Sequence, residues 1–391
     1  MRLYFLILCF VFSCGSLQSQ SLEDTTAQLK NWYAEAAQLI ENYQFKKALE
    51  PLSSYYYYGK YKPDILLKIA YCHQQLGRYR DAKIYYNEVL KRDSINIRAL
   101  SAQANIATLE ANHLKAQGYY DQLLQIDSTN SYYFKQAAYT ALRRSDILLG
   151  IRHFLRAHAL NPEDLEVIDQ LSDIYLALDD VNSADQIVSK GLNLDLNNIK
   201  LLRNKARIHQ KRKEHEKVVE NILKIMAQGD TTDHYQTMLG VAYLKLDSLD
   251  QAIFHLERIV GREKADDRTF HYLGLAYFNK ESYEKSKEYY ALAIEAGVSQ
   301  KIHIYHGDLG LLHEREKHLK PAIAAYKKSL EYYRHPEYLF HLAHASDRYY
   351  KDKKIAFKLY QEYMQTTHRK YKKFTEGRLE QLKEYLHFAG N

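Results

Sequence analysis

Residues 270–290 read FHYLGLAYFNKESYEKSKEYY, and this stretch decides the fold of the chain. Phe270, Leu273 and Tyr277 are three and four residues apart, which places them on one face of a helix. Ser286 and Tyr290 form a similar stripe on a second segment. Two helices approach closely only where the side chains between them are small, and Gly274 is such a position. The stretch therefore predicts two packed helices.

The same pattern recurs along the chain every 34 residues, in three columns that stay in register. The first column is small at every station except Val218: Ala48, Ala82, Ala116, Gly150, Ala184, Val218, Ala252 and Ser286. Four residues later the side chain is always bulky: Leu52, Tyr86, Tyr120, Phe154, Val188, Ile222, Leu256 and Tyr290. Twelve residues before the first column it is always small: Ala36, Ala70, Ala104, Ala138, Ser172, Ala206, Gly240 and Gly274. The two small columns are predicted to form the crossing points of helix pairs.

The array continues beyond these eight stations. After Ser286 the phase slips by two residues to Ala322 and then resumes the regular interval to Ala356, which makes ten repeats. Polar residues that recur at the same interval at the junctions suit helix caps: Asp93, Asp127, Asn161 and Asp195. No segment alternates like a β-strand, so the sequence predicts an all-α fold.

These columns resemble the tetratricopeptide repeat family, whose pattern spans about 34 residues and runs W-x2-L-G-x2-Y, then A-x3-F, then P. Phe270-x2-Leu273-Gly274-x2-Tyr277 matches it well, and Trp32 occupies the Trp position of the first repeat. His73 and His313 replace the Tyr. The resemblance implies a right-handed α-solenoid of about ten helix pairs over 29–370, with a C-terminal capping helix and tail over 371–391.

The N-terminus has the pattern of an export signal over residues 1–19, followed by a short segment over 20–28. Leu3 to Phe12 is a short apolar run behind a basic residue, and small residues follow it. Two interpretations are open: cleavage after small residues, or a lipoprotein signal that attaches a lipid to Cys14. We therefore expect an exported protein, either periplasmic or tethered to a membrane by lipid. No other apolar run is long enough for a transmembrane helix.

Composition limits the function classes. The chain has 391 residues, a formal charge of +7 and 15 Gly, nearly all of them isolated, so no glycine-rich phosphate loop can be assembled. The mild positive charge does not imply a nucleic-acid partner. Cys72, the cysteine outside the signal, is expected to be a small buried apolar residue. No Ser-His-Asp or Cys-His signature is present, so we expect no enzyme activity and no cofactor.

Charged residues on one predicted helix give the sharpest functional signal. Lys200, Arg203, Arg207 and Lys211 form one basic stripe, and the preceding repeat carries Glu166, Asp169 and Asp173 in the matching positions. The resemblance implies that the first helix of each repeat lines a concave groove. Two interpretations are open: a charge ladder that neutralises itself, or a bipolar groove that orients an extended peptide.

Tyrosines form a second group of candidates. Most of them occupy the packing columns, but Tyr132 and Tyr139 do not. The resemblance implies that these two point into the groove, where the apolar ring and polar hydroxyl of tyrosine suit an interface. The run Tyr55-Tyr56-Tyr57-Tyr58 ends a predicted helix, and the sequence does not decide between an exposed edge and packing on the preceding helix.

Histidines are candidate metal ligands. His313-Glu314-x3-His318 is similar to a zinc-protease helix, but its spacing of five residues would rotate His318 off the face of a continuous helix. A looser group lacks the cysteines or carboxylates that would complete a tetrahedral site: His303, His306, His341 and His344. We therefore expect no metal site.

The sequence favours a non-enzymatic scaffold or adaptor of the bacterial cell envelope that binds a protein or peptide partner in its groove. The alternative is a sensory or regulatory receiver for a separate signalling protein. An enzymatic interpretation would depend on the histidines alone.

Overall fold

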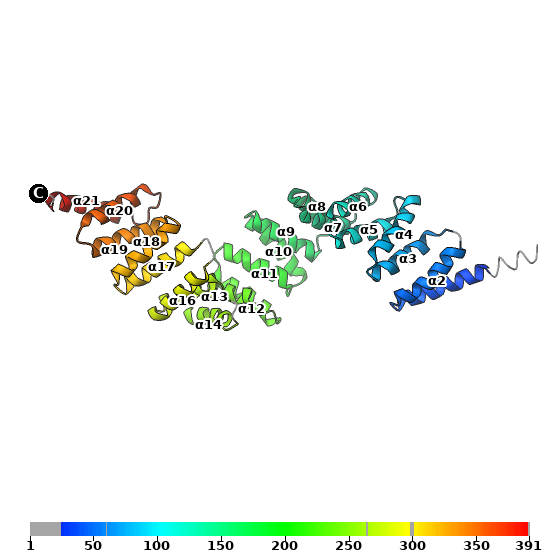
Figure 1. Cartoon of the computed structure of the whole chain (residues 1–391), viewed down its shortest axis with the longest axis horizontal. Helices are drawn as coiled ribbons and strands as arrows, with labels where there is room; N and C mark the ends of the chain where they lie inside the picture. The colour runs from blue at the N-terminus through cyan, green and yellow to red at the C-terminus, as the bar shows by residue number, and fades with distance from the viewer. Residues whose placement is uncertain (1–24, 60, 263–264, 298–300, 390–391) are drawn as a thin grey trace, which may run out of the picture. The chain divides into compact units, whose positions relative to one another are not determined.

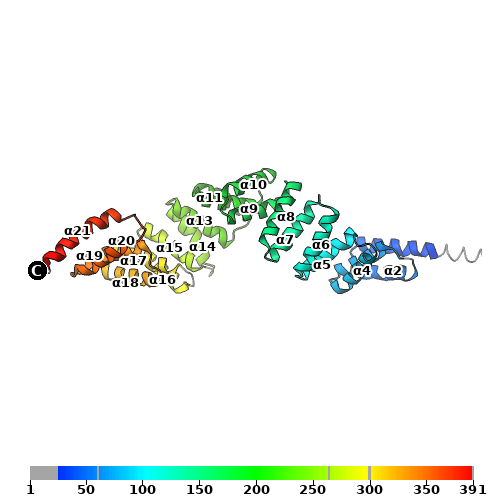
Figure 2. The same cartoon turned by 90° about the horizontal axis from the view of Figure 1, so that it is seen from above.

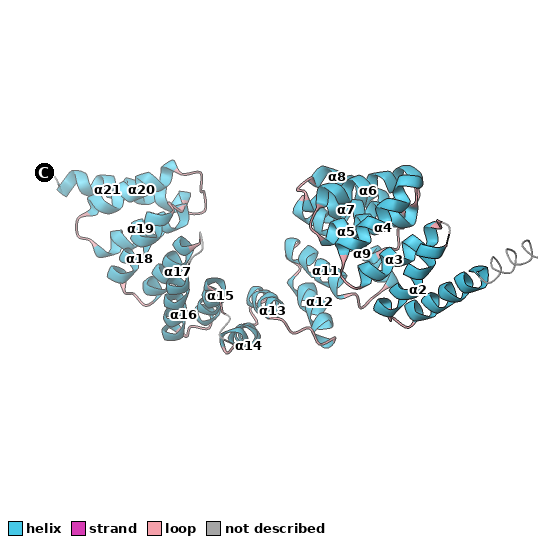
Figure 3. Ribbon diagram, turned by 45° about the vertical axis from the view of Figure 1, so that its right-hand side comes forward, coloured by secondary structure: helices cyan, strands magenta, loops and turns pink. Residues whose placement is uncertain are grey.

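The computed structural model describes residues 25–59, 61–262, 265–297 and 301–389, and helices account for nearly all of them. Figure 3 shows these helices joined by short loops, and the described part of the chain contains no strand. The expected all-α fold is confirmed. The predicted signal sequence, including Cys14, lies outside the described residues.

The chain divides into two compact units, residues 1–180 and 181–391. The first unit contains a helix over residues 25–41 and then α2 (Phe45–Tyr58), α3 (Pro63–Gln75), α4 (Tyr79–Arg92), α5 (Ile97–Leu109), α6 (His113–Ile126), α7 (Ser131–Arg143), α8 (Ile147–Leu160) and α9 (Leu165–Ala177). Within this unit each helix packs on its neighbours in sequence, as Figure 2 shows for α5 to α8.

The second unit continues the same arrangement and is coloured from green to red in Figure 1. It contains α10 (Val181–Leu194), α11 (Ile199–Lys211), α12 (His215–Ala227), α13 (Asp233–Lys245), α14 (Leu249–Val260), α15 (Asp267–Asn279), α16 (Tyr283–Ala296), α17 (Ile302–Arg315), α18 (Leu319–Tyr332), α19 (Pro336–Tyr349), α20 (Lys353–Gln365) and α21 (Lys372–Ala389). The closest associations within both units are between the two helices of one repeat, such as α15 with α16.

The core follows the three sequence columns. Every residue of the two small columns and of the bulky column is buried, from Ala36 near the start to Tyr290. At Gly274 an added Cβ atom would lie 2.6 Å from the ring of Tyr290, so only glycine fits at this crossing without a shift. The prediction that small residues mark the crossing points is therefore confirmed.

A left-handed residue ends the first helix of most repeats. Positive φ angles occur at Tyr43, Gly77, Ala111, Ser145, Asp179, Lys213, Asp247, Glu281 and Lys317. The first eight recur at the interval of the columns, and the last comes two residues late, which reproduces the slip seen in the columns. The turn is closed by backbone bonds, as where the Arg78 amide donates to the His73 carbonyl at 2.9 Å.

Capping confirms part of the sequence prediction. Asp93, Asp127 and Asn161 cap the C-termini of α4, α6 and α8. The side chains that cap the following N-termini come three residues later and recur at the same interval: Asn96, Asn130, Asp164 and Asn198. Their oxygens accept hydrogen bonds from backbone amides of the first helical turn, which would otherwise lack partners.

The two ends of the array carry aromatic and ionic packing. Tyr55 is buried, Tyr58 stacks on Trp32 with ring centroids 5.6 Å apart, and Tyr57 is 80% exposed. The run Tyr55–Tyr58 therefore packs on the preceding helix in part and is exposed in part. At the other end, α21 corresponds to the helix expected after residue 370, and its Arg378 pairs with the buried Asp347 at 2.7 Å.

Candidate functional site

The first helices of the repeats in the first unit line a series of pockets. One pocket of about 460 Å³ is lined chiefly by α3 and α5, with Lys68, Tyr71 and Arg98 among its side chains. A second, of about 280 Å³, is lined by α5, α7 and α9, and includes Tyr139, Arg143 and Glu166. The pockets thus follow the face that the sequence assigned to the groove.

Tyr139 and Glu166, both predicted from the sequence, lie together in the smaller pocket. The Tyr139 hydroxyl donates a 2.8 Å hydrogen bond to Glu166 Oε1, and Lys135 Nζ lies 3.0 Å from Glu166 Oε2. Burial raises the pKa of Tyr139, and the bond to the Glu166 carboxylate raises it further. Partial burial alone would raise the pKa of Glu166, but the bonds from Lys135 and Tyr139 outweigh it and lower the pKa. Glu166 is therefore an ionised carboxylate at neutral pH, and its position is fixed by Lys135 and Tyr139.

Lys135 belongs to a polar ladder between first helices that the sequence analysis did not identify. Its Nζ also lies 2.9 Å from Asp164, the N-cap of α9. Near the N-terminus Tyr33 donates to Asp64 at 2.8 Å, and Arg98 lies 3.6 Å from the same carboxyl group. Partners in this ladder come from adjacent first helices, with sequence separations of about one repeat. That spacing could have revealed the ladder, because the period was already known.

The other predicted residues of the first unit differ in exposure. Tyr132 is 46% exposed at the start of α7, with its ring against Tyr133 at 6.0 Å. Asp169 is only 3% exposed and Asp173 is half-buried, and both make polar or electrostatic interactions. Among the predicted acidic residues, Glu166 is the exposed one.

The basic stripe lies on α11 in the second unit, as predicted. Arg203 and Arg207 are half-buried, and both donate to the side-chain oxygen of the fully buried Asn204, at 3.3 and 3.0 Å. Lys200 and Lys211 are exposed at the two ends of the helix. Arg203, Arg207 and Lys211 make further interactions. Because the stripe and the acidic residues of α9 belong to different units, their opposition across a groove stays a prediction.

Positive charge converges on the next first helix within the second unit. His234, the second residue of α13, is exposed, and its pKa is lowered by partial desolvation and then by the charges of Arg203, Arg207 and Arg268. Arg268 of α15 is held by Asp266 at 2.9 Å. Arg203 and Arg207 of α11 and Arg268 of α15 therefore form a basic surface around His234, in which Arg268 is already paired with Asp266.

The structure separates the four histidines that the sequence grouped loosely. His341 and His344 both face Glu314, whose oxygens lie 3.4 and 2.9 Å from their Nδ1 atoms. His303 instead packs on Tyr333, and His306 stacks on Tyr332 with ring centroids 5.8 Å apart. These histidines thus serve ring packing or an ion-pair network around the partly buried carboxylate of Glu314.

Cys72 is a free, fully buried cysteine, and burial raises the pKa of its thiol to about 11, as expected for an inert packing residue. Within residues 25–389, apart from their gaps, no helix is both long and apolar enough to cross a bilayer.

A sequence-family model described as tetratricopeptide repeat matches residues 63–96 and 268–296. The first match covers the pair α3 and α4, and the second covers most of α15 and α16, the stretch that decides the fold. No curated protein matches the chain.

Solved structures with similar folds include three proteins of known source. A tetratricopeptide repeat protein from Parabacteroides merdae is 13% identical, covers 64% of this chain and 98% of its own, and has a TM-score of 0.45. PilF from Pseudomonas aeruginosa is 18% identical, with coverages of 50% and 90% and a TM-score of 0.43. Yeast Tom70 is 11% identical, with coverages of 92% and 96% and a TM-score of 0.43.

Proposed function

Because this chain is a tetratricopeptide repeat protein, we propose that it is a non-enzymatic scaffold of the bacterial cell envelope that binds a protein partner along its first helices. Repeats of this family generally mediate protein–protein interactions and are typically non-catalytic. The observation that carries the proposal is the series of pockets along the first helices, which contains the predicted Tyr139 and Glu166. The envelope location depends on the export signal in residues 1–19.

The proposed occupant is an extended peptide segment of the partner. The pockets combine tyrosine rings with charged side chains. They can therefore accept side chains of the bound peptide segment while their polar groups form hydrogen bonds to its backbone. Tyr139 and Tyr132 supply rigid contact area at low entropic cost, since a tyrosine has two side-chain torsions.

Charge gives the bound segment its direction. The basic surface of Arg203, Arg207 and Arg268 favours an acidic stretch, whereas Glu166 favours a basic one. Lys200 and Lys211 extend the basic stripe at its two ends. Asp173 is half-buried and completes the acidic side in this proposal, whereas the predicted Asp169 is too deeply buried to contact a bound segment.

Affinity capture with crosslinking from intact cells tests the proposal. The decisive variant is Arg203→Glu/Arg207→Glu, and its matched control is Lys217→Glu/Lys224→Glu, which makes the same charge change at exposed positions on the second helix α12. We expect a discrete partner to be captured by the wild type and the control and lost by the decisive variant, with helicity unchanged by circular dichroism.

Equal capture by both variants would remove the basic surface from the proposal. The pocket around Glu166 would then be tested with Tyr139→Ala, and a partner indifferent to that change as well would contradict binding along the first helices. If the basic surface does bind the partner, the wild type should capture less of it at high salt, because screening reduces attraction between exposed charges.

A further inference from the structure

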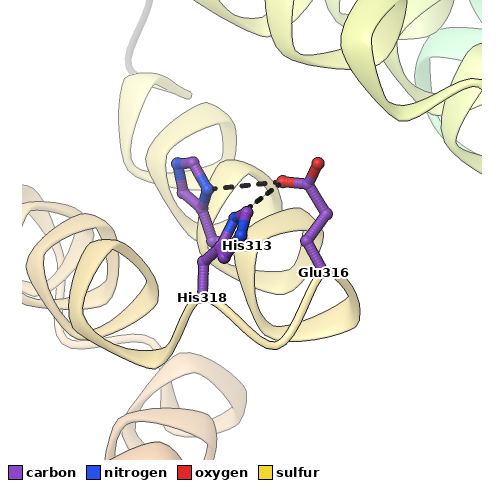
Figure 4. Close-up of side chains that lie close together, drawn as sticks. All are labelled: His313, Glu316 and His318. Carbon is purple, nitrogen blue, oxygen red and sulfur yellow. Dashed lines mark ion pairs between the residues drawn. The ribbon is translucent and has the colours of Figure 1, made fainter.

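The turn between α17 and α18 brings three metal-ligating side chains together. His313 is on the last turn of α17, which ends at Arg315, and Glu316 follows as the C-cap. Lys317 has a φ of +62°, and the His318 amide donates a 2.8 Å bond back to the His313 carbonyl. His318 therefore returns to the side of His313, as Figure 4 shows. The expectation that a five-residue spacing separates the two histidines assumed a continuous helix, and the helix ends before His318.

The distances within the cluster suit coordination of a small cation better than direct hydrogen bonds between the three side chains. Glu316 Oε2 lies 3.7 Å from His313 Nδ1 and 3.6 Å from His318 Nδ1, and the three ligand atoms are all within 4.8 Å of one another. These separations are too long for hydrogen bonds. Ligands about 2.0–2.1 Å from a tetrahedral zinc ion are about 3.4 Å apart. A zinc ion would therefore need shifts of only a few tenths of an ångström in the two recorded pairs.

Two of the three ligand atoms lack a hydrogen-bond partner. His313 Nδ1 and Glu316 Oε2 are both buried atoms without a hydrogen bond, a costly arrangement for polar groups removed from water. Glu316 Oε1 faces Lys287 Nζ of α16 at 3.5 Å, and that lysine is also paired with Glu284 at 3.1 Å. The lysine thus engages the outer oxygen of the carboxylate and leaves Oε2 directed at the histidines.

The same turn elsewhere shows that its geometry brings these positions into contact. At the turn between α11 and α12 the residues equivalent to His313 and His318 are His209 and Glu214, on either side of the left-handed Lys213. There His209 Nδ1 lies 2.6 Å from Glu214 Oε2. There the pair satisfies itself with one hydrogen bond. In the turn after α17, His318 takes the position of Glu214. The carboxylate near both histidine rings there is that of Glu316.

We propose that His313, Glu316 and His318 form a zinc site that joins the end of α17 to the start of α18. Two imidazoles and one carboxylate are a ligand set that suits Zn²⁺. The His318 side chain is 59% exposed, so the fourth position opens to solvent and takes a water molecule. The site is independent of the groove residues, and its role is to fix this turn when the metal is bound.

The test is equilibrium dialysis of the tag-free full chain against Zn²⁺, with metal counted per chain. We expect one tight site, weakened about tenfold or more by His318→Ala and by His313→Tyr. The tyrosine variant restores the residue that other repeats carry in this position, Tyr243 and Tyr277, so it keeps the packing while removing a ligand. His303→Ala, on the same helix but outside the cluster, is the control and should bind like the wild type.

Thermal unfolding supplies a second readout. Zn²⁺ should raise the unfolding midpoint of the wild type and of His303→Ala, and should raise that of His318→Ala clearly less, because a ligand stabilises the folded state according to its affinity for it. Absence of tight Zn²⁺ binding by the wild type, or equal binding by the cluster variants and the control, would overturn the proposal. His318 is exposed, so His318→Ala gives an answer even if His313→Tyr does not fold.

Discussion

The hydroxyl of Ser286 donates a 2.8 Å hydrogen bond to the backbone carbonyl oxygen of Gly274. Both residues are buried, one on each helix of the same pair, and each belongs to a column of small residues. A side chain can reach the backbone of the neighbouring helix in this way only if neither residue holds the helices apart. The bond thus fixes the closest point between α15 and α16.

Gly274→Ala should lower stability. The new Cβ atom would lie 2.6 Å from two ring atoms of Tyr290, which is buried and cannot move freely. Overpacking costs about 1–3 kcal/mol, against about 1 kcal/mol gained in helix propensity. We expect a lower midpoint of thermal unfolding. Gly118→Ala is the matched control: Gly118 is exposed in α6 with open space around it, so alanine should gain about 0.5–1 kcal/mol. Equal effects of the two changes would contradict the packing argument.

Gly77→Ala should also destabilise, for a different reason. Gly77 has a φ of +71° and open space around it, so the cost comes from the backbone, at about 1 kcal/mol. Ala111 occupies the equivalent turn of the next repeat with a φ of +55°. Ala111→Gly should therefore stabilise, though by less, because glycine also gains freedom in the unfolded chain. Chemical denaturation of both variants checks the prediction, and a shift of both in the same direction would refute it.

Glu314→Gln should reduce stability at neutral pH and flatten its loss in acid. Burial alone would raise the pKa of Glu314, but His341 at 3.4 Å and hydrogen bonds from His344 and Tyr326 outweigh it and hold the pKa far below its ordinary value. A depressed pKa means that the ionised carboxylate stabilises the folded state above its unfolded pKa of about 4.3, and that this contribution is lost as the pH falls further.

The expected loss in Glu314→Gln is about 2 kcal/mol at pH 7, the usual scale for hydrogen bonds to a charged group. Unfolding midpoints measured between pH 7 and pH 3 should converge for the wild type and the variant at the acid end. A constant difference across that range would show that the charge of Glu314 does not matter.

Arg378→Ala should loosen the C-terminal helix. Arg378 donates to both oxygens of Asp347, at 2.7 and 3.1 Å, and Asp347 is only 6% exposed. Removing the arginine leaves a buried carboxylate with Lys353 as its remaining ion pair, at a cost of about 3 kcal/mol. Hydrogen exchange of the α21 amides should accelerate. Lys383→Ala, at an exposed position of α21, should change exchange little. Similar protection in both variants would exclude a docking role for this pair.

Periodicity made most of the fold predictable. Ala48, Tyr86 and Gly240 sit in columns whose meaning depends only on side-chain size, so the sequence located the helix crossings and the core. The sequence did not predict the left-handed turns, because Tyr43 and Lys213 are not residues that favour a positive φ. It did not separate the two kinds of cap, because Asp93 and Asn96 are both polar and lie in the same short junction.

The candidate site was less predictable because it depends on contacts between repeats. Helical spacing put Arg203 and Arg207 on one face correctly, but it gave no sign that both would bond the buried Asn204. Lys135 was not considered, since its partners Asp164 and Glu166 lie in the next repeat. The cluster at His318 was hidden because it requires the helix to end, and the sequence pattern was evaluated as one continuous helix.

The longer step from Glu281 to Lys317 shows how such a protein can change length. Two additional residues entered between these turns, yet Tyr290 and Tyr326 remain fully packed on either side, and α16 still packs on α17. Each repeat contacts only its neighbouring repeats, so a change in the length of one junction affects packing only there. Insertions at a junction between repeats are open to evolution and to engineering, whereas an insertion inside a helix would move every later side chain of that helix off its column.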